Sequence, residues 1–81
     1  MYYLYILRCK DDSLYTGIAV DLVRRVKEHN SSALGAKYTR GRRPVKLVFS
    51  QKFRNRSAAL REEARIKKLS RSEKLYLVKN K

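Results

Sequence analysis

The hydrophobic positions near the start of the chain predict two strands joined by a tight turn. Residues 2–9 are almost entirely aromatic, β-branched or bulky apolar, which favours a strand. Asp11 and Asp12 then supply turn residues, and residues 14–18 predict a second strand. Because the connection is so short, we expect the two strands to pair as an antiparallel hairpin.

The register of this hairpin decides which side chains share a face. A three-residue loop pairs Leu7 with Tyr15. Tyr5 and Tyr15 are then diagonal neighbours on one face, because side chains alternate between the two faces along a strand. A slip of one residue would move one tyrosine to the opposite face. The predicted register therefore places two phenols together.

The next hydrophobic positions recur at helical spacing. Asp21 is a suitable N-cap for a helix that runs to about Asn30. Arg25 and His29 lie one turn apart on the flank of its apolar stripe, so they can face a common site. The predicted apolar stripe consists of Leu22, Val23 and Val26.

The second half of the chain predicts a loop, a strand and two helices. Residues 31–44 hold two of the three glycines and the only proline, which indicates a loop, and residues 45–49 predict a third strand. A helix is expected over residues 57–69. The sequence Ser70-Arg71-Ser72-Glu73 matches a capping box, so a short last helix should follow it. We expect this helix to bring four side chains onto the core: Leu75, Tyr76, Leu77 and Val78.

Two adjacent glutamates interrupt the apolar arc of the helix predicted over residues 57–69. At about 100° per residue, Glu63 projects near the middle of the arc and Glu62 falls toward its edge. An inward carboxylate needs a cation or hydrogen bonds, because burying an unpaired charge costs several kcal/mol. Glu63 is therefore the preferred candidate for a cation ligand, with Glu62 as the alternative.

The length and composition are those of a small globular protein. A chain of 81 residues buries only about 60% of its unfolded surface, so we expect residues 1–81 to form a single domain. No apolar run approaches the roughly 18 to 20 residues that cross a bilayer, and the N-terminus has no leader pattern. We therefore expect a cytoplasmic protein without a membrane partner. Cys9 is the only cysteine, which excludes an intrachain disulfide and favours a small buried side chain.

The net charge of the chain indicates what kind of partner it binds. Lys and Arg number 21 against 7 Asp and Glu, which gives a formal charge of +14 and favours a polyanion. No acidic residue lies between Glu28 and Glu62, where the basic residues gather. This pattern favours nucleic acid, although a solubilising basic face or a contact with a membrane surface or ribosomal RNA would have the same composition. The basic residues that fall inside this stretch include Lys37, Arg40, Arg42, Arg43, Lys46, Lys52, Arg54 and Arg56.

An ordered set of motifs resembles the GIY-YIG nuclease superfamily. Tyr3-Leu4-Tyr5 and Tyr15-Thr16-Gly17 are similar to its paired GIY and YIG motifs, with Tyr3 in place of Gly, Leu4 in place of Ile, and Thr16 in place of Ile. An arginine, a histidine and a helical glutamate follow in the family's order: Arg25, His29 and Glu63. The stretches 35–40 and 66–69 further resemble the compact stand-alone bacterial branch. The resemblance covers the chain from about Tyr3 to Val78.

The resemblance implies an α/β (α+β) fold and an enzyme. The fold is a three-stranded antiparallel sheet flanked by helices, in the order β-β-α-β-α-α, and the activity is metal-dependent endonucleolytic hydrolysis of phosphodiester bonds in DNA, in repair or recombination. Tyr15 would orient or deprotonate the attacking water, with Tyr5 in support. Arg25 would bind the scissile phosphate, and Glu63 would hold one Mg²⁺ or Mn²⁺ ion. His29 occupies a position where relatives place a histidine or tyrosine near the nucleophile.

The residues themselves leave some roles open. Tyrosine has an ordinary pKa near 10, so Tyr15 could act as a base only if neighbouring cations favoured its phenolate. His29 is the alternative base, or else a structural residue. A two-metal site would need several converging acidic residues, and a ββα-metal nuclease would need more than one histidine, so both fit this chain less well.

The same sequence leaves the partner partly open. DNA is the expected substrate and RNA is not excluded. Larger relatives carry a separate DNA-targeting domain, and the sequence leaves open whether a partner protein targets this one. The alternative function is a non-catalytic nucleic-acid binding module that keeps the GIY-YIG-like fold. The predicted nucleic-acid contacts are Lys37, Tyr38, Arg40, Arg42 and Arg43.

Overall fold

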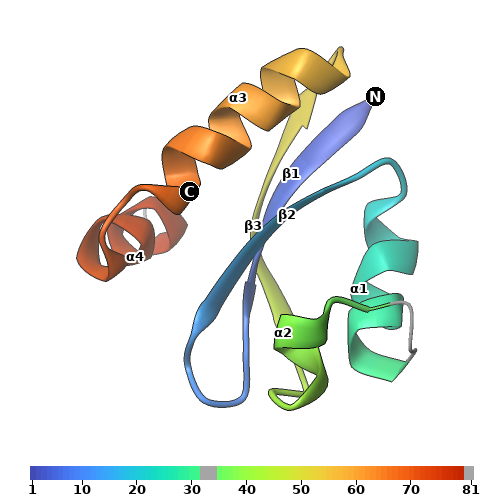
Figure 1. Cartoon of the computed structure of the whole chain (residues 1–81), viewed down its shortest axis with the longest axis vertical. Helices are drawn as coiled ribbons and strands as arrows, with labels where there is room; N and C mark the ends of the chain where they lie inside the picture. The colour runs from blue at the N-terminus through green and yellow to red at the C-terminus, as the bar shows by residue number, and fades with distance from the viewer. Residues whose placement is uncertain (32–34, 80–81) are drawn as a thin grey trace.

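The computed structural model describes residues 1–31 and 35–79, and its elements follow the predicted order with one additional short helix (Figure 1). The elements are β1 (Tyr2–Arg8), β2 (Leu14–Ala19), α1 (Leu22–Ser31), α2 (Lys37–Arg40), β3 (Lys46–Phe53), α3 (Arg56–Lys67) and α4 (Arg71–Lys79).

The three strands form one antiparallel sheet in the order β2-β1-β3, which confirms the predicted fold class. The predicted hairpin register is confirmed as well, since Leu7 pairs with Tyr15 and Tyr5 pairs with Gly17. Strand β1 is central and covered on both faces, and this is why its sequence is apolar almost throughout rather than alternating. Its residues 4–7 are at most 1% exposed.

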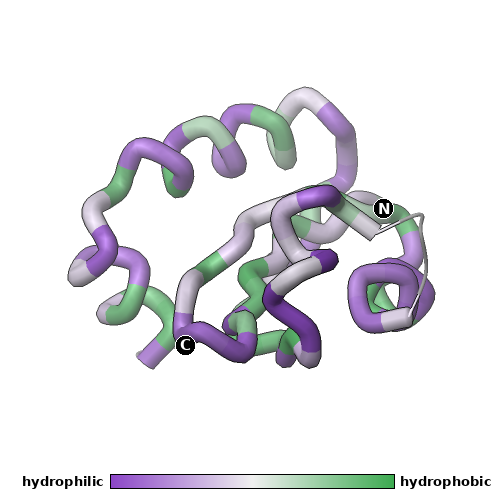
Figure 2. The backbone as a smooth tube through the Cα atoms, turned by 60° about the horizontal axis from the view of Figure 1, so that its bottom comes forward, coloured by the Kyte–Doolittle hydropathy of each residue, from purple (hydrophilic) through white to green (hydrophobic). Residues whose placement is uncertain are grey.

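Helices lie on both faces of the sheet (Figure 1). On one face α3 and α4 pack over a core of Leu4, Ile6, Phe49 and Ile66. On the other face α1 packs beside a second cluster that includes Tyr5 and the buried Cys9. Figure 2 shows hydrophilic and hydrophobic residues alternating along the helices, as expected for helices with one face in solvent. No helix within the described ranges is long and apolar enough to cross a membrane.

Two boundaries differ from the prediction. Residues 31–44 are not wholly a loop, because Lys37–Arg40 forms α2. This helix of four residues is too short for its periodicity to be seen, and tertiary hydrogen bonds through Thr39 hold it in place. Strand β3 runs over Lys46–Phe53 instead of ending at Phe49, because it pairs along the whole free edge of β1.

Three predicted core side chains are exposed. Val23 of α1 is 70% exposed, and Leu75 and Tyr76 of α4 are 39% and 71% exposed. Each helix lies on the sheet along a single line of contact, so only part of its apolar arc is buried. In α4 that part is Leu77 and Val78, which pack against the core of the α3 face as predicted.

Candidate active site

A cavity of about 350 Å³ lies at the edge of the sheet that β2 forms. Strands β1 and β2 supply its floor, while α1 and α3 reach it from opposite faces of the sheet. The tertiary structure thus brings together four of the five predicted catalytic residues. These are Tyr5, Tyr15, Arg25 and Glu63.

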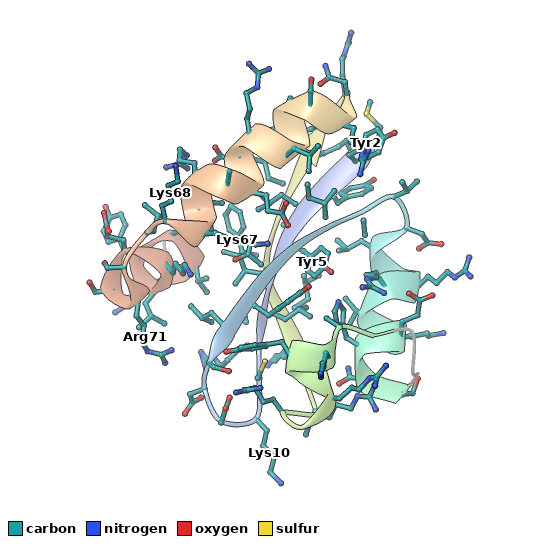
Figure 3. All side chains as sticks on the ribbon, viewed as in Figure 1. Tyr2, Tyr5, Lys10, Lys67, Lys68 and Arg71 are labelled. Atoms are coloured by element: carbon teal, nitrogen blue, oxygen red, sulfur yellow. The ribbon has the colours of Figure 1, made fainter. Side chains whose placement is uncertain are left out.

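Tyr5 lies at the centre of the molecule, between the two helical layers (Figure 3). Its side chain is only 1% exposed, and its ring centroid lies 6.4 Å from that of Tyr15. The ring passes directly over Gly17, where an added Cβ would come within 2.5 Å of the Tyr5 hydroxyl oxygen. A glycine is therefore required at the end of the second motif because the phenol occupies the space of a side chain.

A buried chain of hydrogen bonds begins at Tyr5. Its hydroxyl lies 2.8 Å from Nε2 of His29, and Nδ1 of His29 lies 2.9 Å from Oγ1 of Thr39. The Thr39 hydroxyl donates to the carbonyl of Ala36 at 2.9 Å, so it accepts from Nδ1–H. The Ala36 N–H is 3.4 Å from Nδ1 and too distant to compete well. With Nδ1 protonated, Nε2 is the acceptor, and the Tyr5 hydroxyl donates a hydrogen bond to it.

Tyr5 is a neutral phenol at physiological pH. Burial, with smaller contributions from the nearby Tyr15 and Glu63, raises its pKa to about 12 although the adjacent Arg25 guanidinium lowers it. A group with this pKa holds its proton firmly. Tyr5 thus acts in the site as a hydrogen-bond donor and acceptor rather than as a phenolate.

His29 is neutral and does not line the cavity. Its side chain is fully buried, and burial, followed by the positive charge of Arg25, lowers its pKa to about 4. Both ring nitrogens have partners, so a base at this position would act on the cavity only through the Tyr5 hydroxyl. This geometry makes His29 a positioning residue for Tyr5.

The burial of His29 predicts an acid-sensitive fold. The folded-state pKa of about 4 lies below the ordinary value of 6.5, so the unfolded chain binds the additional proton between these values. The contribution of His29 to stability is full above pH 6.5 and is lost as the pH falls toward 4, by about 3 kcal/mol. Urea unfolding at several pH values between 4 and 6.5 measures this loss. The variant His29→Gln should lack this part of the pH dependence, and an unchanged slope would contradict the assignment.

Arg25 directs its guanidinium from α1 into the cavity. Its side chain is 28% exposed, Nη1 donates to Glu28 Oε1 at 2.9 Å, and the guanidinium also contacts the Tyr5 hydroxyl. Arg24, the preceding residue, pairs with the same Glu28 at 3.3 Å but is 73% exposed and does not line the cavity. Helical spacing thus separates an arginine in the site from one in solvent.

The two glutamates of α3 take different directions. Glu63 lines the cavity, is 19% exposed, and lies 3.3 Å from Nζ of Lys67. Glu62 is held by two hydrogen bonds of 2.7 and 2.6 Å from Arg65 and does not line the cavity. Within residues 1–31 and 35–79 no three His, Cys, Asp or Glu side chains cluster as a metal site would require. A cation in the cavity would therefore have Glu63 as its one carboxylate ligand.

The cavity also contains residues that the sequence analysis did not assign to the site. Arg56 and Leu60 line it together with Glu63, and Tyr2 adds a third tyrosine. Positions 56, 60 and 63 lie on one face of α3, because residues four and seven apart are aligned along a helix. Once Glu63 faces the site, that spacing identifies Arg56 as a second guanidinium beside it.

The residues predicted to bind nucleic acid differ in their surroundings. Tyr38 stacks on Tyr15 with ring centroids 5.7 Å apart, and the Arg42 guanidinium lies 4.1 Å from the centre of the Tyr38 ring. Arg43 serves the fold, since its Nε donates to the carbonyl of His29 at 2.5 Å. Lys37 and Arg40 are exposed on α2.

The chain is similar to known proteins over most of its length. Residues 1–76 match the family described as the GIY-YIG catalytic domain. A UPF0213 protein of Syntrophus aciditrophicus is 54% identical over 77 residues, which cover 95% of this chain and 88% of the relative. A UPF0213 protein of Clostridium perfringens is 54% identical over 81 residues, which cover 100% of this chain and 86% of the relative.

Two solution NMR structures have the same fold. A UPF0213 protein from Bacillus halodurans matches with a TM-score of 0.65 at 50% identity, covering 100% of this chain and 86% of that one. A protein from E. faecalis matches with a TM-score of 0.62 at 46% identity, covering 94% and 81%. With the family matched over nearly the whole length, this chain belongs to the GIY-YIG family, which places it in a nuclease superfamily.

Proposed function

We propose that this protein is a metal-dependent endonuclease that hydrolyses phosphodiester bonds in DNA. The observation that carries the proposal is the convergence of Glu63, Arg25 and two phenols on one cavity. These groups come from both helical layers and the hairpin, and a merely basic surface would not need them together. The formal charge of +14 supplies the long-range attraction for a polyanionic substrate.

Hydrolysis requires a positioned water, stabilisation of the charge that develops on the phosphate, and release of an alcohol. Arg25 contributes fixed N–H donors to a nonbridging phosphate oxygen. Arg56, on the α3 side of the cavity, can contact an adjacent phosphate. Tyr15 orients the attacking water, and Tyr5, held by His29, keeps Arg25 and the water in place. Water oxygen bonds to phosphorus as the bond from phosphorus to the leaving oxygen breaks. The attacking water loses a proton to solvent and the leaving oxygen takes one up from solvent, so the products are a phosphate monoester and an alcohol.

The residues of the cavity fit one hard divalent cation. Glu63 offers carboxylate oxygens, the ligand type that Mg²⁺ and Mn²⁺ prefer, and such an ion keeps several waters when it has few protein ligands. A volume of about 350 Å³ accommodates both those waters and a phosphate group. When bound, the ion supplies charge neutralisation for the phosphate and lowers the pKa of a coordinated water.

Cleavage of labelled DNA by the purified chain tests the proposal. We expect strand scission of linear, nicked and branched DNA with Mn²⁺ or Mg²⁺, and none when EDTA removes the ion, because without a cation the Glu63 carboxylate repels the phosphate. A matching RNA substrate in parallel reports the preference between the two nucleic acids. Scission that persists in EDTA, or no scission of any DNA with either metal, would overturn the proposal.

One observation favours a second candidate, a nucleic-acid binding module without turnover. Lys67 lies on the next turn of α3 and already neutralises Glu63 at 3.3 Å. If this ion pair persisted, a divalent ion would not bind. Mn²⁺ binding followed by electron paramagnetic resonance separates the two functions, because only the enzyme needs Glu63 to hold an ion.

A further inference from the structure

A second cavity, of about 180 Å³, lies beside the first. Three segments that are distant in sequence form it: the β1–β2 hairpin, α2 and α4. Its lining residues are Ser13, Leu14, Tyr38, Arg71 and Lys74. Of these, only Tyr38 belongs to the nucleic-acid contacts predicted from the sequence.

Helix α4 is attached to the hairpin at this cavity. An Nη2 hydrogen bond of 2.6 Å joins Arg71 to the carbonyl of Asp12, across most of the chain. Figure 3 shows Arg71 projecting from α4 on the side of the hairpin tip, where Lys10 is labelled. Lys74 follows Arg71 by three residues and therefore lies on the same side of α4. The contact with Asp12 fixes the Arg71 guanidinium at the cavity, and Lys74 lines the cavity beside it.

The two charged side chains that line this cavity are both cationic. Neither Arg71 nor Lys74 forms an ion pair with a carboxylate in the described part of the chain. The carboxylate of Asp11, in the neighbouring turn, accepts from the Ser13 hydroxyl at 2.6 Å and pairs with Arg42 at 3.1 Å. Because Asp11 is already paired with Arg42, its carboxylate does not neutralise Arg71 or Lys74.

A pair of stacked tyrosines joins the two cavities. Tyr15 lines the first and Tyr38 lines the second, and their ring centroids are 5.7 Å apart with planes 29° apart. Tyr38 is 39% exposed, but Tyr15 and the Arg42 guanidinium already contact its ring, so only its remaining exposed edge can contact a ligand. Successive phosphates of one DNA strand advance about 3.4 Å along the duplex axis. A strand whose phosphate occupies the first cavity therefore reaches the second within a few nucleotides.

We propose that the second cavity is a phosphate subsite, in which Arg71 and Lys74 bind a backbone phosphate of the same DNA strand that enters the active site. Tyr38 contacts the sugar or base between the two phosphates. Paired cations are a common means of holding a nucleic-acid strand by its phosphates. The inference rests on the proposed function for the choice of ligand, but it concerns binding and not turnover.

The salt dependence of DNA binding tests the subsite without any cleavage. Binding of a fluorescent duplex is measured in EDTA for the wild type, for Arg71→Gln/Lys74→Gln, and for the control Arg61→Gln/Lys68→Gln. The control removes the same charge from two exposed positions, one in α3 and one at its C-cap, that line neither cavity. Loss of one phosphate contact should make log K less steep in log[salt] by about 0.9, in the first double variant only. Equal slopes for the two double variants would overturn the subsite.

DNA in which one backbone phosphate is replaced by an uncharged analogue can locate the phosphate that Arg71 and Lys74 bind. In a series of duplexes, each with one methylphosphonate, we expect one or two positions to weaken binding to the wild type but not to Arg71→Gln/Lys74→Gln. Lys74→Gln alone, which leaves the contact between Arg71 and Asp12 intact, should show part of the same loss. If every position weakens both proteins equally, no phosphate is bound there. A chain that cleaves nothing can still pass these tests, and a fully active nuclease can fail them, so the two proposals fail separately.

Discussion

Replacement of Glu63 by Gln should lower metal-dependent DNA cleavage by about 100-fold to 1000-fold, the effect of removing one main source of charge stabilisation in an active site. Glu63 is the one acidic side chain that lines the cavity among the described residues. The amide keeps the shape of the side chain but loses the charge that holds the cation. We expect Mn²⁺ affinity to fall together with the cleavage rate, while DNA binding in EDTA stays unchanged or strengthens, because a negative charge has been removed.

The neighbouring residue provides a matched control. Glu62→Gln changes the same charge on the same turn of α3, but Glu62 is engaged by Arg65 outside the cavity. It should cleave DNA at nearly the wild-type rate, and its stability should change by less than about 1 kcal/mol, as for an exposed ion pair. If both variants cleaved equally well, Glu63 would not be the metal ligand, and the proposed mechanism would lose its basis.

Replacement of Arg25 by Ala should lower cleavage by about 100-fold or more at saturating DNA. Its guanidinium is the donor from α1 that lines the cavity, and it also contacts Tyr5, so its loss removes a phosphate ligand and loosens the phenol. Single-turnover cleavage rates measure the effect apart from binding. Arg25→Lys should recover only part of the activity, because an ammonium group cannot donate in the planar fork that suits a phosphate.

Arg24→Ala is the control for this variant. Arg24 pairs with the same Glu28 and carries the same charge, but it points into solvent. It should lower DNA affinity slightly through the general field and leave the single-turnover rate near that of the wild type. A similar loss of rate in Arg24→Ala and Arg25→Ala would mean that net charge, and not the geometry of Arg25, governs the reaction.

The sequence allowed the hairpin register to be predicted because local rules decide it. A three-residue connection and the alternation of side chains were sufficient to place Tyr5 and Tyr15 on one face, and the ring centroids lie 6.4 Å apart. The direction of Glu63 followed in the same way from helical periodicity. Asp21 caps α1 as expected, accepting from the Arg24 N–H at 3.1 Å. Each of these features depends on residues close together in the chain.

Contacts between distant segments decided the rest. Thr39 lies in a helix of four residues that no periodic pattern marks, yet it completes the buried hydrogen-bond chain from Tyr5. The sequence left His29 open between a base and a structural residue, because only the packing of α1 against the sheet shows both of its nitrogens engaged. Val23 and Tyr76 were predicted inside and lie outside, since an apolar stripe does not reveal how wide a face its neighbours will cover.

By itself, the sequence determined the strands, the principal helices and the faces on which two phenols, a guanidinium and a carboxylate lie, because backbone geometry converts spacing into direction over a few residues. Only the tertiary structure decided that α1 and α3, on opposite faces of the sheet, both reach its β2 edge, and that Arg71 attaches α4 to the β1–β2 hairpin through Asp12. Which elements come together depends on how whole helices and strands pack, and no local sequence rule specifies that packing.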